Sequence, residues 1–237
     1  MSLWGPQNAA PGSQPVAVVS GGWFGGDAGG LTPLLRDLVS AVPTAPFNQN
    51  VIDQSYRDAM MAQYRCANLT VAQCHRVGAN PAATLPRHSY VVDRGRLLDN
   101  GLDSTAIGAV RTAYDADPTD GQFRVLSITG LGGQINAVAP EATAYPHRSA
   151  QFYLNTTVGL NTFTPTPDQQ AAATMWADGC FAVAARYGDG QGMVNFIDPR
   201  LPDWRHAYYA GNYDRLLWTK NAYDEDNFFR FAQSIGA

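Results

Sequence analysis

Strand-like segments follow one another in the middle of this chain, with no helical pattern between them. Residues 123–138 have the pattern of a strand, a glycine turn and a second strand, and residues 150–160 that of another strand. Further strand-like runs at 16–24, 87–95 and 192–198 alternate with helical patterns. Strict alternation would predict a doubly wound parallel sheet, but neighbouring strands favour antiparallel pairing. The sequence therefore predicts an α+β fold: a largely antiparallel sheet with helices on one face and its other face free for a ligand or another domain.

Two helix starts are marked by a threonine that is followed directly by a proline. Thr32 and Thr166 each offer a capping hydroxyl, and the proline after each suits the first helical position. Apolar residues recur at helical spacing after both pairs, so each pair predicts the start of a helix. Further helices are predicted at 51–66, 103–118 and 203–224, the last interrupted near Gly211.

Composition limits the class of protein. The 237 residues suit one large domain or two small ones; 45% are hydrophobic and 15% are charged. Low charge and a net charge of −4 argue against a disordered or a nucleic-acid-binding chain. No apolar run approaches the roughly 20 residues of a membrane-spanning helix, and the first residues lack the pattern of a signal peptide. We therefore predict no nucleic-acid partner and no membrane association.

Three cysteines and four histidines show none of the spacings typical of metal sites. Cys66 and Cys74 are close in sequence, and two alternatives stay open: a disulfide, which would indicate export, or two ordinary thiols. His147 is expected to be a structural histidine or a loop residue, and Asp198 to cap a turn. No glycine-rich segment has a nucleotide-binding frame. These residues predict no metal and no self-contained active site.

The chain closes on aromatic residues in a polar setting. Phe228, Phe229 and Phe231 stand among aspartate, asparagine, arginine and glutamine residues. C-terminal segments fray unless something holds them, so this composition predicts that the tail docks on a surface.

Four blocks of sequence together resemble one family. They are "GLGGQINAV" (130–138), "ATAYPHRSAQFYLNTTVGL" (142–160), "GMVNFIDPRL" (192–201) and "YYAGNYDRLLWTKNAYDEDNFFRFAQSI" (208–235). In order and spacing they are similar to blocks of the berberine bridge enzyme-like, FAD-linked oxidases of the vanillyl-alcohol-oxidase superfamily. The last block is the most specific, whereas the first hundred residues match only in outline.

The resemblance implies a domain organisation. In the family an N-terminal domain binds FAD, in many members covalently, and nothing in this chain matches that domain. Residues 1–14 are then expected to be a lead-in of vector residues and linker, and 15–205 the substrate-binding α+β domain. Residues 206–237 are expected to be a berberine-like segment that docks on the FAD domain.

In that tail, the resemblance assigns apolar contacts with the FAD domain to the phenylalanines, and hydrogen bonds to Asn227 and Gln233. Phe228 or Phe229 is nevertheless expected in the core of this chain, but not all three phenylalanines.

The resemblance also implies a reaction. Family members transfer a hydride from a small organic molecule, such as a natural product or a sugar, to FAD, while a base takes a proton and O2 usually reoxidises the flavin. The parent protein is then an FAD-dependent oxidoreductase or oxidase, of which this chain supplies the substrate-binding and C-terminal portion. The chain alone is expected to bind no FAD and to be inactive without the FAD domain. The resemblance leaves open whether the flavin is covalent, and whether the protein is cytoplasmic or exported.

Site residues follow by position from the family blocks. Thr129, Leu154 and Phe196 occupy positions where family members carry a tyrosine or carboxylate for acid–base work, so the usual base is absent here. The expected roles are: substrate binding by Thr129, Gln134, Leu154 and Phe196; cofactor binding by Asn195, Asn227 and Phe228; and catalysis by Tyr153 or Tyr90 as substitute bases.

A second function class stays open: a stand-alone, non-catalytic ligand- or protein-binding domain of the same fold. The lost base positions favour this alternative, whereas the retained tail favours the oxidase.

Overall fold

The computed structural model of this chain describes residues 2–4, 15–24, 26–86 and 90–237. The described residues of 20–86 form one compact unit, and those of 2–19 and 90–237 form the other. The expected lead-in lies outside the described residues except at 2–4, as do residues 87–89 of the strand expected at 87–95. The expected boundary between residues 205 and 206 stays a prediction.

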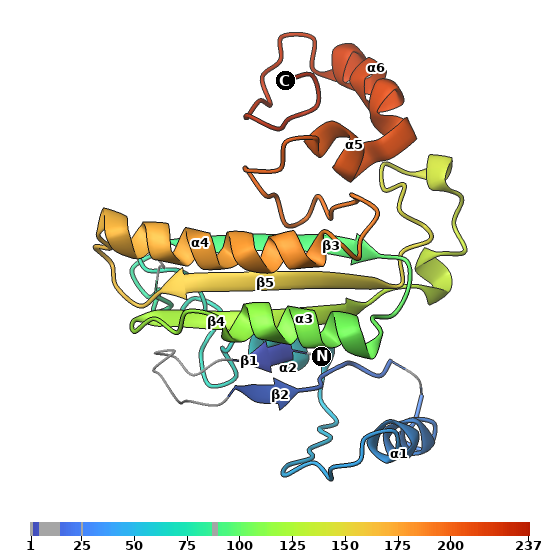
Figure 1. Ribbon diagram of the computed structural model, residues 1–237, viewed down its shortest axis with the longest axis vertical. Helices are drawn as coiled ribbons and strands as arrows, with labels where there is room; N and C mark the ends of the chain where they lie inside the picture. Colours follow the sequence, from blue (N-terminus) through green and yellow to red (C-terminus); the bar gives the residue numbers. More distant parts are fainter. Residues whose placement is uncertain (1, 5–14, 25, 87–89) are drawn as a thin grey trace. The chain divides into compact units, whose positions relative to one another are not determined.

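A five-stranded sheet organises the larger unit (Figure 1). Its strands lie in the order β2-β1-β4-β5-β3, and every neighbouring pair is antiparallel. The longest ladder joins β4 to β5, with Gln122 opposite Leu160 and Gly130 opposite Phe152. The predicted antiparallel α+β class is thereby confirmed. The strands are β1 (Ser2–Trp4), β2 (Val16–Val18), β3 (Val91–Leu98), β4 (Gln122–Gly130) and β5 (Phe152–Leu160).

Two helices, α3 (Ser104–Asp115) and α4 (Pro167–Ala184), cover one face of this sheet (Figure 1). The main core lies between sheet and helices, where Leu154 and Val158 of β5 pack with Trp176 of α4. Burying a side chain of this size contributes about 1.5–3 kcal/mol relative to leaving it exposed. This helical layer confirms the prediction of helices on one face of the sheet.

The start of α4 follows from a few neighbouring residues. Thr166 Oγ1 accepts a hydrogen bond from the Gln169 N–H at 3.2 Å, and Gln169 Oε1 accepts one from the Thr166 N–H at 3.0 Å. This reciprocal pair is a capping box, with Pro167 at the first helical position as predicted. Asp103 is the N-cap of α3, where its carboxylate accepts a hydrogen bond from the Ala106 N–H at 2.7 Å.

Two predicted strands are wrong. Beyond the glycine turn the chain forms a short 3-10 helix, η1 (Gly133–Ile135), followed by η2 (Pro140–Ala142), and residues 192–198 form turns. In the latter segment the Phe196 N–H donates to the Met193 carbonyl at 3.0 Å, so its backbone bonds are local rather than those of a ladder. The strand predicted at 16–24 is confined to β2.

The smaller unit contains α1 (Leu31–Ser40), α2 (Tyr56–Gln63) and a disulfide between Cys66 and Cys74. Of the two alternatives for these cysteines, the structure therefore has the disulfide. Thr32 does not cap α1 as predicted. The N-cap is Gly30, and Thr32 Oγ1 donates back to the Ala28 carbonyl at 3.0 Å.

Short helices and a tail without regular structure complete the larger unit. The helices are α5 (Trp204–Tyr209), η3 (Ala210–Asn212) and α6 (Tyr213–Tyr223). The predicted interruption near Gly211 is confirmed. It coincides with Ala210, whose φ of 42° lies in the left-handed region that a regular helix excludes.

Candidate functional site

Tyr153 marks the face of the sheet that points away from α3 and α4. In the strand register it stands opposite Leu97 of β3 on one side and Thr129 of β4 on the other. Side chains directly opposite in an antiparallel ladder lie on the same face and in contact range. Successive residues alternate between faces, so Asn155 and Thr157 lie on the Tyr153 face, whereas Leu154 points into the helical layer.

The Tyr153 ring is enclosed by apolar neighbours. It stacks on Phe196, with ring centroids 5.4 Å apart and an interplanar angle of 22°. It also packs in a small buried cluster with Leu97 and Ala150, which Leu131 and Met193 border. A methyl group at Gly95 would lie 2.6 Å from Tyr153 Oη, so only glycine on β3 leaves room for this hydroxyl.

A chain of polar contacts extends from Tyr153 along the same face. Tyr153 Oη donates to Asn155 Oδ1 at 3.3 Å, and Asn155 Nδ2 donates to Asp93 Oδ1 at 3.2 Å. Thr157 Oγ1 also donates to Asp93 Oδ1. Because a carboxylate only accepts hydrogen bonds, Asp93 determines which end of the Asn155 amide faces Tyr153. Asp93 is the only acidic residue in the five described strands.

Burial, and secondly the nearby Asp93 carboxylate, raise the pKa of Tyr153 far above its ordinary value of 10. The phenol is therefore neutral at physiological pH. It can hold and orient a polar group, but this pKa disfavours the role of general base for which the sequence made it a candidate.

The structure brings three of the expected site residues together and separates others. Tyr153, Thr129 and Phe196 meet on one face. Leu154 is 1% exposed and lies in the main core. Tyr90 packs against the same core and hydrogen-bonds Thr174 of α4 at 2.6 Å, which favours a packing role for both.

The remaining expected residues are exposed. Gln134 lies in η1, Asn195 lies in the turn before Phe196, and Asn227 and Phe228 lie in the tail. The roles expected of them stay predictions. Asp93 and Asn155 are the polar residues that the sequence reasoning missed. The alternation Tyr153, Asn155, Thr157 within β5 was a signal for Asn155, because it places tyrosine, amide and hydroxyl groups on one face.

The tail turn is organised by an ion pair. Lys220 contacts the Asp224 carboxylate, which accepts from the N–H groups of Phe228 at 2.7 Å and Phe229 at 3.1 Å. The Lys220 hydrogen bond lowers the pKa of Asp224. Asn227 has a φ of 50°, which this tight turn requires.

The turn presents its aromatic rings outward. Phe228, Phe229 and Phe231 are 79%, 73% and 54% exposed, so the expectation that Phe228 or Phe229 joins the core of the chain is wrong. Gln233 is buried in this chain and donates to the Asp198 carbonyl at 2.9 Å. The expectation that Gln233 also hydrogen-bonds the FAD domain stays a prediction.

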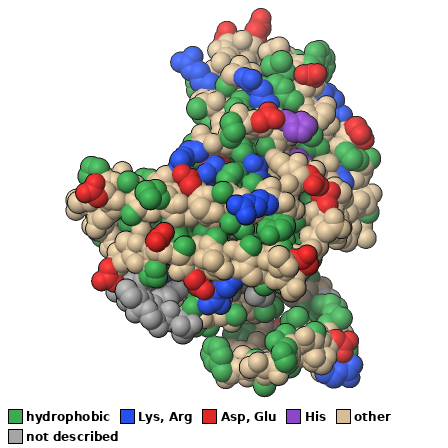
Figure 2. Space-filling view, in the orientation of Figure 1, with side chains coloured by type: hydrophobic (Ala, Val, Ile, Leu, Met, Phe, Trp, Pro, Cys, Tyr) green, Lys and Arg blue, Asp and Glu red, His purple; other side chains and the backbone are tan. Residues whose placement is uncertain are grey.

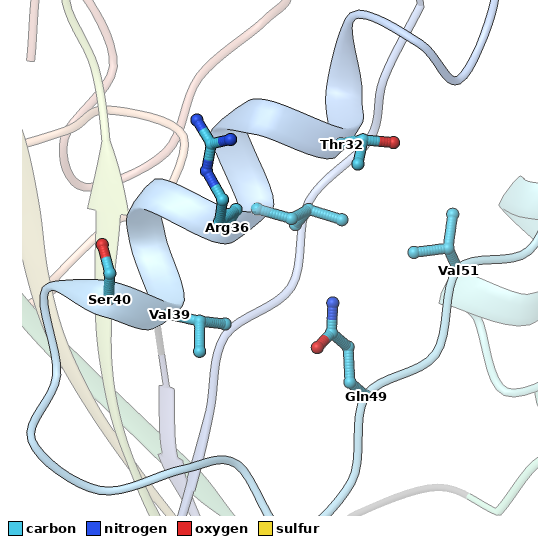
Figure 3. Close-up of a pocket in the computed structure, with 7 residues that line it drawn as sticks. Thr32, Arg36, Val39, Ser40, Gln49 and Val51 are labelled. Atoms are coloured by element: carbon cyan, nitrogen blue, oxygen red, sulfur yellow. The ribbon is translucent and has the colours of Figure 1, made fainter.

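A separate hollow lies in the smaller unit between α1 and the segment around Gln49 and Val51 (Figure 3). Thr32, Arg36 and Val39 of α1 line its other side, and Arg36 is the one ionisable residue among the seven drawn. None of the expected site residues lines it, so it has no part in the Tyr153 face.

Charges on the visible face of the molecule are mixed in sign: basic and acidic side chains are interspersed in Figure 2. Within the described ranges, no three histidine, cysteine, aspartate or glutamate side chains gather as ligands for a metal ion. No helix among the described residues is long and apolar enough to cross a bilayer.

Comparison with known proteins places these features in a family context. Residues 193–236 match the family model described as "Berberine and berberine like". An uncharacterized FAD-linked oxidoreductase of Bacillus subtilis (strain 168) is 30% identical over 144 residues, which are 60% of this chain and 30% of that protein. The chain thus spans less than a third of the length of this curated relative.

Solved structures share the fold. A variant of berberine bridge enzyme superposes with a TM-score of 0.67 at 19% identity, covering 99% of this chain and 48% of that one. A glycopeptide hexose oxidase complexed with teicoplanin gives a TM-score of 0.53 at 27% identity, covering 66% and 34%. The C-terminal segment of this chain is thus similar to the berberine-like family, the curated relative is an FAD-linked oxidoreductase, and the fold is that of berberine bridge enzyme.

Proposed function

We propose that this chain is the substrate-binding and C-terminal portion of an FAD-dependent oxidoreductase that oxidises a small organic molecule, a natural product or a sugar. The observation that supports this most is the position of Phe196. It belongs to the segment that matches the berberine-like family model, and it packs on Tyr153 on the sheet face opposite α3 and α4. The segment that matches the family model therefore contributes a side chain to the candidate site.

FAD, when bound by the parent protein, accepts the hydride. Asn195, Asn227 and Phe228 suit contact with it, because their side chains are exposed and make no part of the core. We propose that the flavin is held mainly by the N-terminal FAD domain of the parent protein, and that any covalent bond to it is made there. O2 is the proposed final electron acceptor.

The Tyr153 face would orient the substrate. The exposed hydroxyl of Thr129 offers a hydrogen bond, and the Phe196 ring, 48% exposed, offers an apolar surface that the buried Tyr153 ring supports. Asp93 is the carboxylate of this face. It accepts a hydrogen bond from the Asn155 amide, which in turn accepts one from the Tyr153 hydroxyl. In this proposal Thr129 and Phe196 orient the substrate, Tyr153 supports the Phe196 ring, and Asp93 supplies negative charge.

The tail is proposed to dock on the FAD domain. Three phenylalanines this exposed on one turn are unusual for a surface that faces only water. The Lys220–Asp224 pair shapes the turn in advance, so less conformational entropy is lost on docking.

The non-catalytic binding domain remains as second candidate, supported by the residues at the usual base positions. Thr129, Leu154 and Phe196 supply no group that titrates near neutral pH, and Tyr153 is held neutral.

One experiment separates the two. The full-length parent protein is purified and precipitated with acid, and flavin absorbance is measured in pellet and supernatant. Flavin in the pellet indicates a covalent cofactor, and flavin in the supernatant a non-covalent one; O2 uptake with a panel of alcohols, sugars and phenols then tests oxidation. No flavin in either fraction, even after reconstitution with FAD, would exclude the oxidase and leave the binding domain.

A further inference from the structure

Asp198 lies where four parts of the chain meet. Its Oδ2 accepts from Arg94 Nε at 2.8 Å, and its Oδ1 accepts from the Arg200 N–H at 2.9 Å. Its own N–H donates to Tyr208 Oη at 2.8 Å, and its carbonyl accepts from Gln233 Nε2 at 2.9 Å. Strand β3, the turn after Asp198, helix α5 and the C-terminal tail are thus joined at one residue. The sequence had indicated only a turn cap, which the Arg200 contact confirms.

The ion pair at this joint is buried. The side chains of Arg94 and Asp198 are 8% and 7% exposed. Arg94 also donates to Asp178 of α4 at 2.7 Å, and its guanidinium carbon lies 3.8 Å from the centroid of the Phe181 ring. Removing one partner of such a pair leaves an uncompensated charge in the interior. Asp198 is therefore held firmly relative to both β3 and α4.

This anchoring bears directly on the Tyr153 face. Asp198 follows Phe196 by two residues, and Phe196 stacks on Tyr153. The Phe196 side chain is half exposed, and its N–H bonds only within the turn, to Met193. The placement of the turn over Tyr153 thus depends on the anchored residue at its end.

We propose that Asp198, paired with Arg94, is a positioning residue. It holds the 193–198 turn against β3 so that Phe196 covers Tyr153, and through Gln233 it ties the tail to the same point. Tail and site are thereby coupled: what displaces one displaces the other. The inference rests on the proposed function, because the site it orients is the proposed substrate face.

The test uses the full-length parent protein with 4-fluorophenylalanine at position 196, and needs no substrate. The ring current of Tyr153 gives the fluorine a shifted 19F resonance. Asp198→Asn keeps the size of the side chain and removes its charge. We expect the resonance to move toward that of the free amino acid, and amide exchange in the peptide 229–237 to rise at least about tenfold, as for a segment that opens locally.

Two further variants keep the test decisive. Arg200→Ala removes the half-exposed ion pair with Asp178 but keeps the backbone N–H that contacts Asp198, so resonance and exchange should stay as in the wild type. Arg94→Lys keeps the charge, but a single ammonium lacks the fork that reaches both carboxylates. It should shift the resonance in the same direction as Asp198→Asn, and it replaces that variant if the latter does not fold.

The proposal is overturned if both Asp198→Asn and Arg94→Lys leave the resonance in place, even with a lower melting temperature. Asp198 would then contribute stability alone. A parent protein that binds no flavin would refute the proposed function instead, while the resonance would still decide whether Asp198 positions Phe196.

Discussion

The two compact units of this chain are stabilised in different ways. In the larger unit, sheet and helices enclose a core around Leu154, Val158 and Trp176. In the smaller unit neither α1 nor α2 buries a residue, and Cys66 is the one buried position among the described residues of 20–86. Apolar packing holds the first unit, whereas a covalent bond between Cys66 and Cys74 holds the second. The difference indicates that the smaller unit needs support that its own side chains do not supply.

Leu154→Ala should have the largest effect. Removing this fully buried side chain leaves a cavity in the main core, and such substitutions cost about 2–5 kcal/mol of unfolding free energy. Urea unfolding followed by circular dichroism measures it. The matched control, Leu34→Ala on α1, removes a side chain that is 54% exposed and should change the free energy by less than about 0.5 kcal/mol. Equal losses of unfolding free energy for the two variants would refute the claim that only the larger unit is held by apolar packing.

The double substitution Cys66→Ser with Cys74→Ser should follow. Opening this short loop restores chain entropy to the unfolded state, which costs about 2–3 kcal/mol. We expect hydrogen exchange to rise within residues 20–86 and to stay unchanged in β5. Faster exchange in β5 would show that the disulfide stabilises the larger unit as well.

Thr166→Ala removes the capping box of α4 and should cost about 0.5–2 kcal/mol. Its counterpart on α1, Thr32→Ala, removes a hydroxyl that caps nothing, so its effect on the melting temperature should be smaller. If Thr32→Ala proved the more destabilising, the assignment of the caps would be wrong.

The smallest effect is expected from Phe47→Ser in the smaller unit. This ring is 87% exposed, so in the isolated chain its loss should change the unfolding free energy by less than about 0.5 kcal/mol. A loss above 1 kcal/mol in a thermal melt would mean that the smaller unit has a packed core after all.

Sequence reasoning succeeded where the signals are local or shared with a family. The start of α4 was predictable because a capping box involves residues three apart. The antiparallel class followed from neighbouring strands, and the berberine-like block identified the C-terminal segment before any coordinates. Thr32 shows the limit of this reasoning: the same Thr-Pro pair stands two positions too late to cap α1, because the N-cap is Gly30.

The chemistry of the candidate site required the tertiary structure. Tyr153, Asp93 and Phe196 lie far apart in sequence, and only the register of β3 with β5 and the turn at 193–196 bring them together. A shift of one residue in strand pairing moves each side chain to the opposite face of the sheet, and the residue type alone does not determine that pairing. Leu154 illustrates this point. The family resemblance predicted a substrate-binding role for it, but the strand register places its side chain in the main core. Local sequence patterns thus predicted the main helices and strands and the resemblance to a family, whereas long-range pairing decided which side chains meet.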